Sequence, residues 1–177
     1  MAIVAAGPQP AASGAPSCDF GPRKSIRLPK SGYLGGDPFL LTWCTSRRRD
    51  IFARPSDAAA ALASIRQAES ETEAVVYCAV VMPDHIHAVV AAQTDKSPLD
   101  TAYCAKRLTT VGLRRLGLSG AVWERRVHDR GLRCTLGAGS VVAAVQSVLD
   151  NPVRHGLASS WKAWPHHFIA EGVLESL

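Results

Sequence analysis

Two apolar runs joined by a proline turn constrain the fold of this chain more than any other stretch. Residues 74–92 read AVVYCAVVMPDHIHAVVAA, in which β-branched runs of strand length lie on either side of Pro83-Asp84. Proline presets the first corner of a turn, and aspartate can hydrogen-bond to its own backbone there. The sequence therefore predicts two adjacent strands of one sheet, connected by this turn.

A pair of histidines opens the second of these strands, at His85 and His87. Because side chains along a strand alternate between faces, both imidazoles leave the sheet on one side and Ile86 leaves it on the other. Two neutral imidazoles on one face can bind a divalent metal when a third donor joins them. The same spacing fits two half-exposed histidines that bond to water or backbone, so spacing alone leaves both interpretations open.

Four further elements follow from local patterns. The alanine-rich segment after Ser56, which can act as an N-cap, and the segment after Pro98 have helical composition. Strands are predicted over residues 38–45 and 122–127, and helices over residues 56–68 and 98–116. The order strand, helix, strand, strand, helix, strand predicts an α+β fold, a ferredoxin-like (RRM-like) antiparallel sheet with two helices on one face. We expect the other face, with the two histidines, to be open.

A C-terminal helix is predicted after Ser140, which can cap it. Ser147 lies opposite its apolar stripe, and Asn151 follows four residues later. Because residues four apart stack on one helix face, side chains at 147 and 151 would point at the same target. Asn151-Pro152 is also a common helix stop, which leaves a purely structural role open. The stripe consists of Val141, Val142, Val145, Val148 and Leu149.

The string Val-Met-Pro-Asp-His-Ile-His at residues 81–87 resembles the histidine–hydrophobe–histidine (HUH) signature of the IS200-like transposase family, which includes the REP-associated tyrosine transposases. Residues 37–52 resemble the family's first strand and the arginine-rich turn after it. Residues 122–133 and 151–157 resemble its last strand and the end of its final helix. Several motifs in the right order make this resemblance, which covers residues 27–168, more specific than any one of them.

The resemblance implies the same ferredoxin-like fold and a partner that is single-stranded or hairpin DNA. It also implies strand cleavage and joining by a tyrosine, with a divalent metal, Mg²⁺ or Mn²⁺, held by His85, His87 and Asn151. The family's tyrosine comes four residues before the asparagine, and here that position is Ser147. Every tyrosine of the chain, at positions 33, 77 and 103, precedes it. The resemblance therefore implies transposase-type DNA binding with impaired cleavage.

Other chemistries remain open for this chain. Serine is a much weaker acid than tyrosine and needs a nearby base, which Ala144 and Asn151 do not offer to Ser147. Tyr103, on another predicted helix, is a substitute nucleophile, although a packing role explains it more simply. Metal-activated water is a further alternative. The last alternative is a non-catalytic domain that derives from a transposase and binds hairpin DNA or protein.

Basic clusters indicate where DNA could bind. The formal charge of +5 suits a polyanionic partner, and convergent arginines would follow phosphates and make binding depend on salt. Trp123 is a candidate for stacking on a base. The candidate DNA-binding arginines are Arg47, Arg48 and Arg49 after the first strand, Arg107 on the second helix, and Arg125 and Arg126 on the fourth strand.

Composition divides the chain into a tail and one domain. Residues 1–24 are rich in Ala, Gly, Pro and Ser, which predicts a disordered tail before a domain at residues 25–177. The five cysteines are odd in number and lack a Cys-x-x-Cys motif, which is typical of reduced thiols in a cytoplasmic protein. No apolar run is long enough to span a membrane. Monomer and homodimer both remain open.

Overall fold

A computed structural model describes residues 30–34, 36–93, 95–132 and 139–175. The predicted tail at residues 1–24 lies outside the described residues. In chain order, the strands and α-helices are β1 (Pro38–Thr45), α1 (Pro55–Thr72), β2 (Val75–Met82), β3 (His85–Ala91), α2 (Pro98–Arg115), β4 (Trp123–Gly131), α3 (Gly139–Leu149), α4 (Asn151–Arg154), β5 (His167–Ile169) and α5 (Glu171–Leu174). None of the helices in these described residues is long and apolar enough to cross a membrane.

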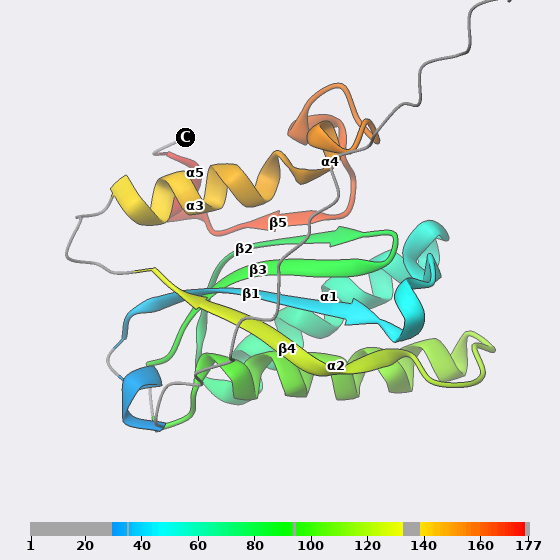
Figure 1. Cartoon of the computed structure of the whole chain (residues 1–177), viewed down its shortest axis with the longest axis horizontal. Coiled ribbons are helices and arrows are strands. Elements are labelled where there is room, and N and C mark those ends of the chain that lie inside the picture. The colour runs from blue at the N-terminus through cyan, green and yellow to red at the C-terminus, as the bar shows by residue number, and fades with distance from the viewer. Residues whose placement is uncertain (1–29, 35, 94, 133–138, 176–177) are drawn as a thin grey trace, which may run out of the picture.

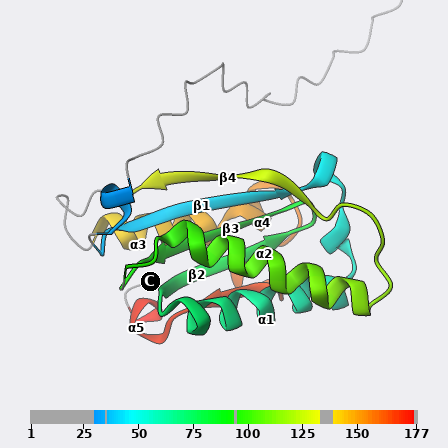
Figure 2. The ribbon, with the colours of Figure 1, turned by 90° about the horizontal axis from the view of Figure 1, so that it is seen from below.

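The strands form one antiparallel sheet in the order β4-β1-β3-β2-β5. Helices α1 and α2 lie side by side on one face of it, as the view from below shows (Figure 2). This arrangement confirms the predicted α+β, ferredoxin-like fold. The short strand β5 was not predicted; it adds to the β2 edge, where Phe168 pairs with Ala79.

The predicted hairpin forms around Pro83-Asp84, with Met82 paired with His85. Strand β3 lies between β1 and β2, so every one of its residues has a neighbour on both sides. Alternation along β3 directs Ile86, Ala88 and Val90 into the core beneath α1 and α2. The histidines consequently project from the opposite face.

That opposite face is covered, so the expectation of an open face is wrong. Helix α3 lies across it, as Figure 1 shows, and Val145, Val148 and Leu149 pack on it. The reason lies in β2, whose VVYCAVVM run is apolar on both sides and therefore needs a cover on both sides. The strand residues in contact with the helix cluster are Cys78, Val80, Met82 and Val89.

Two predicted helix caps also differ from the structure. Helix α1 begins at Pro55, with Arg54 at the N-cap, so Ser56 lies within the first turn. Arg54 instead donates to Asp57 through its Nε, at 2.8 Å, and secures the start of the helix. Helix α3 begins at Gly139, so Ser140 lies inside it rather than before it.

The packing of α3 on the sheet gives the first prediction. Leu149 is 1% exposed, so Leu149→Ala should lower the free energy of unfolding by roughly 2–5 kcal/mol, because it leaves a cavity beneath the helix. Urea unfolding would measure this loss. Leu157→Ala, at a position that is 43% exposed, is the matched control and should cost less than about 0.5 kcal/mol. Equal losses would contradict the buried role of α3.

Candidate metal centre and nucleic-acid surface

The structure brings His85 and His87 together on one face of β3. Their Nε2 atoms lie 3.0 Å apart, and the ring centres are 4.7 Å apart with planes almost perpendicular at 88°. His85 is buried and His87 is half-buried. The two imidazoles therefore present the same ring nitrogen to one point, next to the turn that starts β3.

Hydrogen bonds at the other ring nitrogens hold this orientation. His85 Nδ1 donates to Asp84 Oδ1 at 2.5 Å, and Arg48 Nε donates to Asp84 Oδ2 at 2.8 Å. His87 Nδ1 shares a hydrogen bond with Thr42 Oγ1, at 2.8 Å. A carboxylate that accepts from Nδ1 fixes the tautomer of a neutral histidine, so its Nε2 lone pair faces outward. Arg48, Asp84 and Thr42 thus orient the pair.

Burial keeps both imidazoles neutral. It lowers the pKa of His85 despite the raising effect of Asp84, and it lowers the pKa of His87 to about 3, with the neighbouring His85 acting in the same direction. A neutral imidazole is the form that binds metal, so the pair needs no deprotonation at neutral pH. Two facing Nε2 atoms are stable when a proton or a cation lies between them.

The pair fits a divalent cation. Two nitrogens at roughly 2.1 Å from one ion, at right angles, would lie about 3 Å apart, which is the separation of these Nε2 atoms. Across the described ranges, no three His, Cys, Asp or Glu side chains are grouped closely enough to hold a metal ion. A further protein ligand would then be an oxygen outside this set, such as an amide or backbone carbonyl, or a side chain that moves.

Asn151, the third ligand that the resemblance implies, carries such an amide oxygen. It begins α4 and is buried, and its Nδ2 donates to the carbonyl oxygens of Ser147 at 3.1 Å and Val148 at 2.9 Å. These bonds secure the amide nitrogen, while no described residue donates a hydrogen bond to Oδ1. An amide held in this way can offer its oxygen to a hard or borderline cation.

The two candidate nucleophiles lie in different places. Ser147 is exposed on the last turn of α3, and its Oγ lies 3.5 Å from Arg154 NH2, a cation rather than a base. Tyr103 is 39% exposed on α2, in the helix layer on the far side of the sheet from the histidines. The structure therefore does not bring Tyr103 to the pair.

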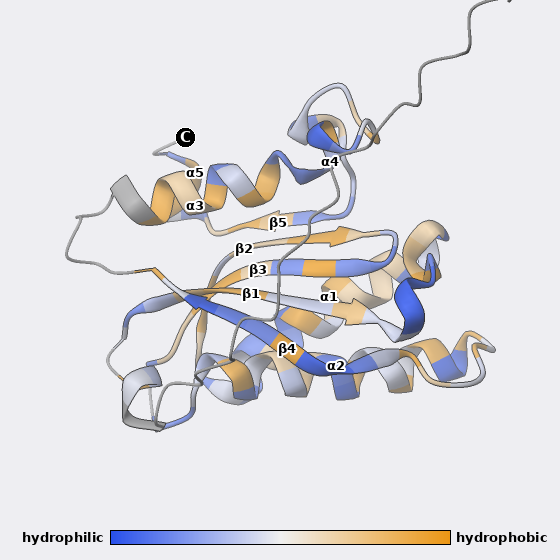
Figure 3. Cartoon of the chain, in the orientation of Figure 1, coloured by the Kyte–Doolittle hydropathy of each residue, from blue (hydrophilic) through white to orange (hydrophobic). Residues whose placement is uncertain are grey.

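Five of the six candidate arginines gather at one end of the sheet. Arg47, Arg48 and Arg49 follow β1, and a bulge between Trp43 and Thr45 sets Arg125 and Arg126 opposite Cys44. Cys44 pairs with His85 on its other side. Strand β1 therefore lies between Arg125 and Arg126 on β4 and the histidines on β3. Figure 3 shows the hydrophilic β4 edge that carries the last two.

Of the remaining two candidates, Arg107 lies on α2 in the helix layer and Trp123 begins β4. Arg107 NH2 is paired with Glu71 Oε2 of α1 at 2.9 Å, so it is away from the other arginines. Trp123 is half-buried, donates from Nε1 to the Lys106 carbonyl at 3.0 Å, and its ring lies 5.4 Å from that of Phe52. These contacts favour a packing role for Trp123 over base stacking.

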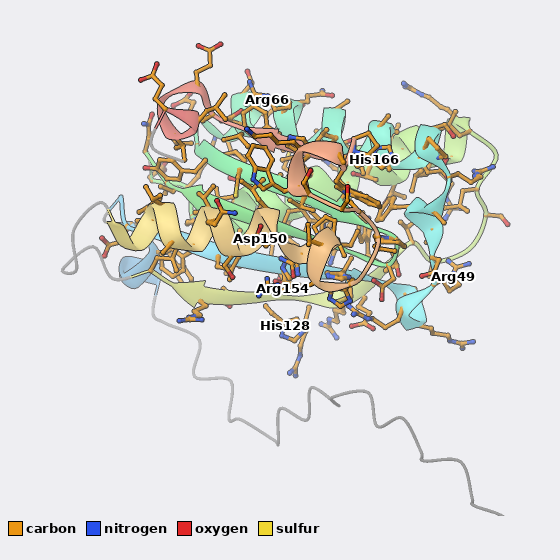
Figure 4. The ribbon with its side chains drawn as sticks, turned by 90° about the horizontal axis from the view of Figure 1, so that it is seen from above. Arg49, Arg66, His128, Asp150, Arg154 and His166 are labelled. Atoms are coloured by element: carbon orange, nitrogen blue, oxygen red, sulfur yellow. The ribbon has the colours of Figure 1, made fainter. Side chains whose placement is uncertain are left out.

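Two further side chains near the pair come from the end of α4, where Figure 4 labels Arg154, and neither was assigned to the metal site from the sequence. The charges of Arg154 and His155 both act on His87, and the His155 ring centre lies 6.4 Å from that of His85. The signal was present in the Asn-Pro-Val-Arg-His string, since residues that follow Asn151 by one helical turn share its neighbourhood.

Comparison with known proteins gives one family. The sequence model described as "Transposase IS200 like" matches residues 39–127, half of the chain. No curated protein matches the sequence.

Two solved structures are similar in fold. A REP-associated tyrosine transposase bound to a REP hairpin is 20% identical, with a TM-score of 0.59 over 76% of this chain and 78% of that one. A transposase from Deinococcus radiodurans R1 is 17% identical, with a TM-score of 0.48 over 68% of this chain and 93% of that one.

The lowered pKa of His87 gives a prediction for the metal-free protein. The pKa of His87 is 6.5 in the unfolded chain and about 3 in the folded chain. Between these two pH values, the unfolded chain binds a proton at His87 and the folded chain does not. The contribution of His87 to the free energy of unfolding is therefore complete above pH 6.5. It decreases as the pH falls through this window, by on the order of 1.4 kcal/mol per pH unit for this one group.

Urea unfolding of the wild type and His87→Gln with chelator, at several pH values in this window, tests the expectation. The variant should show the shallower loss, because contributions from all other groups are shared by both proteins. Parallel curves would mean that His87 titrates normally in the folded state.

Proposed function

Because this chain belongs to the IS200-like transposase family, we propose that it binds single-stranded or hairpin DNA next to His85 and His87. The observation that carries the proposal is the Nε2 separation of 3.0 Å beside a cluster of arginines. The related REP-associated transposase whose structure contains a REP hairpin supports the same class of partner. A strand that crosses this end of the sheet would meet cationic side chains on one side and the histidines on the other.

The site is proposed to hold a divalent cation, Mg²⁺ or Mn²⁺, through the two Nε2 atoms and Asn151 Oδ1. When bound, such an ion acts as a Lewis acid on a phosphate oxygen. The chain's own residues prepare this role, since Asp84 and Thr42 orient the imidazoles and burial keeps them neutral. Imidazole donors suit Mn²⁺ better than Mg²⁺, which prefers oxygen ligands.

Strand cleavage is proposed to be impaired in this chain. Serine occupies position 147, and its described hydrogen-bond partner is the guanidinium of Arg154, which cannot accept a proton. A hydroxyl without a base is a poor nucleophile at neutral pH. Tyr103 lies in the opposite layer, which argues against its use as a substitute.

Salt dependence of DNA binding tests the proposed surface. Replacing Arg125 and Arg126 together by alanine should weaken the binding of labelled hairpin DNA, because phosphate contacts release counterions. Fluorescence anisotropy at several salt concentrations should show the slope of log K against log[salt] falling by about 1.4, if each arginine contacts one phosphate of a single strand. This cluster is exposed, so folding should be preserved.

The matched control removes the same charge from the helix layer. Arg107→Ala with Arg115→Ala should leave both the affinity and the slope close to those of the wild type, since both side chains lie on α2. If the two double variants lose affinity equally, DNA is attracted by net charge alone and the proposed surface is wrong.

Restoring the phenol tests the inherited geometry of the nucleophile. Ser147→Tyr would place a phenol, whose pKa near 10 is far below that of a serine hydroxyl, at the position where the resemblance implies the nucleophile. Incubation with labelled hairpin DNA and Mn²⁺ should then give a covalent adduct on a denaturing gel, whereas the wild type gives none. The triple variant Ser147→Tyr, His85→Ala, His87→Ala should lose the adduct. An adduct that survives the triple change would argue against a role for the pair.

A further inference from the structure

His155 is an imidazole beside the histidine pair that neither the resemblance nor the proposed function uses. It occupies the C-cap of α4, where its backbone N–H donates to the Asn151 carbonyl at 3.0 Å. Its side chain is exposed and makes no hydrogen bond or ion pair with the described residues. It is therefore a ring with free nitrogens, placed one helical turn after Asn151.

Its position relative to the pair suits a shared ion. The centres of the His155 and His85 rings are 6.4 Å apart, whereas those of His85 and His87 are 4.7 Å apart. Two imidazoles that bind one ion at roughly 2.1 Å have ring centres about 4.5 Å apart at right angles and about 6.5 Å apart on opposite sides. Both measured separations lie within this range.

The side chain of His155 is exposed at the end of α4 and no hydrogen bond with the described residues restrains it. The planes of its ring and that of His85 are inclined at 67°, so the two rings lie edge to face rather than stacked. As described, the three rings do not yet surround a common point. A rotation of this exposed side chain, rather than a backbone change, would close the remaining distance.

We propose that His155 is an additional ligand of the cation held by His85 and His87, and that it makes the site favour Mn²⁺, Co²⁺ or Zn²⁺ over Mg²⁺. This inference rests on the metal-binding part of the proposed function. A third imidazole adds a borderline nitrogen donor, which raises affinity for later transition metals and does little for Mg²⁺.

The test measures metal binding directly, without DNA or activity. Calorimetric titration of the full chain with Co²⁺ and with Mg²⁺, at one fixed pH above the range in which imidazole protonates, gives the two affinities. His155→Ala should weaken Co²⁺ binding by about tenfold or more and change Mg²⁺ binding by less than about twofold. The visible absorption of bound Co²⁺ should change at the same time, because the ligand set has changed.

Two further variants make the result specific. His155→Asp supplies a different donor at the same position and should recover part of the Co²⁺ affinity. His166→Ala removes a histidine whose ring packs on Trp164, with ring centres 5.6 Å apart, and should bind Co²⁺ like the wild type. Melting temperatures would verify that each variant is folded.

The outcomes separate this inference from the proposed function. If His85→Ala weakens Co²⁺ binding and His155→Ala does not, His155 is no ligand and the pair retains its role. If neither change affects Co²⁺ binding, the pair does not hold the metal, and both the proposed metal site and this inference are wrong.

Discussion

The pairing of β3 between β1 and β2 is the constraint on which the rest of the structure depends. Backbone hydrogen bonds to both neighbours fix the strand's register, with His85 opposite Cys44 on one side and Met82 on the other. A shift by one residue would exchange the faces, burying the imidazoles beneath α1 and α2 and exposing Ile86. The same ladder that builds the core therefore aims the two histidines.

The cover on the histidine face has a chemical consequence. Helix α3 buries apolar residues of β2 and β3, and on the same face of the sheet His85 is buried and His87 is half-buried. Desolvation disfavours the imidazolium, so it lowers the pKa of both rings and keeps them in the ligand form. Asp84 opposes this effect for His85, but the carboxylate is shared with Arg48, which limits how far it stabilises a positive charge. Packing and protonation state are thus linked.

The arrangement of charge follows from the fold rather than from the number of basic residues. Arg125 and Arg126 come beside Arg47, Arg48 and Arg49 because β1 and β4 are antiparallel neighbours with a bulge at that end. Arg107 belongs to the other layer, where Glu71 neutralises it. A polyanion would therefore encounter two different surfaces, a basic end beside the histidines and a helix layer in which Arg66 and Arg107 are paired with Glu69 and Glu71.

The sequence by itself determined the local elements, because alternation, proline turns and alanine-rich segments act over a few residues. It predicted β1 at the observed bounds, the hairpin at Pro83-Asp84 and the common face of His85 and His87. Only the tertiary structure decided that α3 covers that face, that Trp123 packs on Phe52, and that His155 lies beside the pair. These facts depend on contacts between residues far apart in the chain, and such contacts are selected by the need to bury apolar surface on both sides of β2, which no short pattern records.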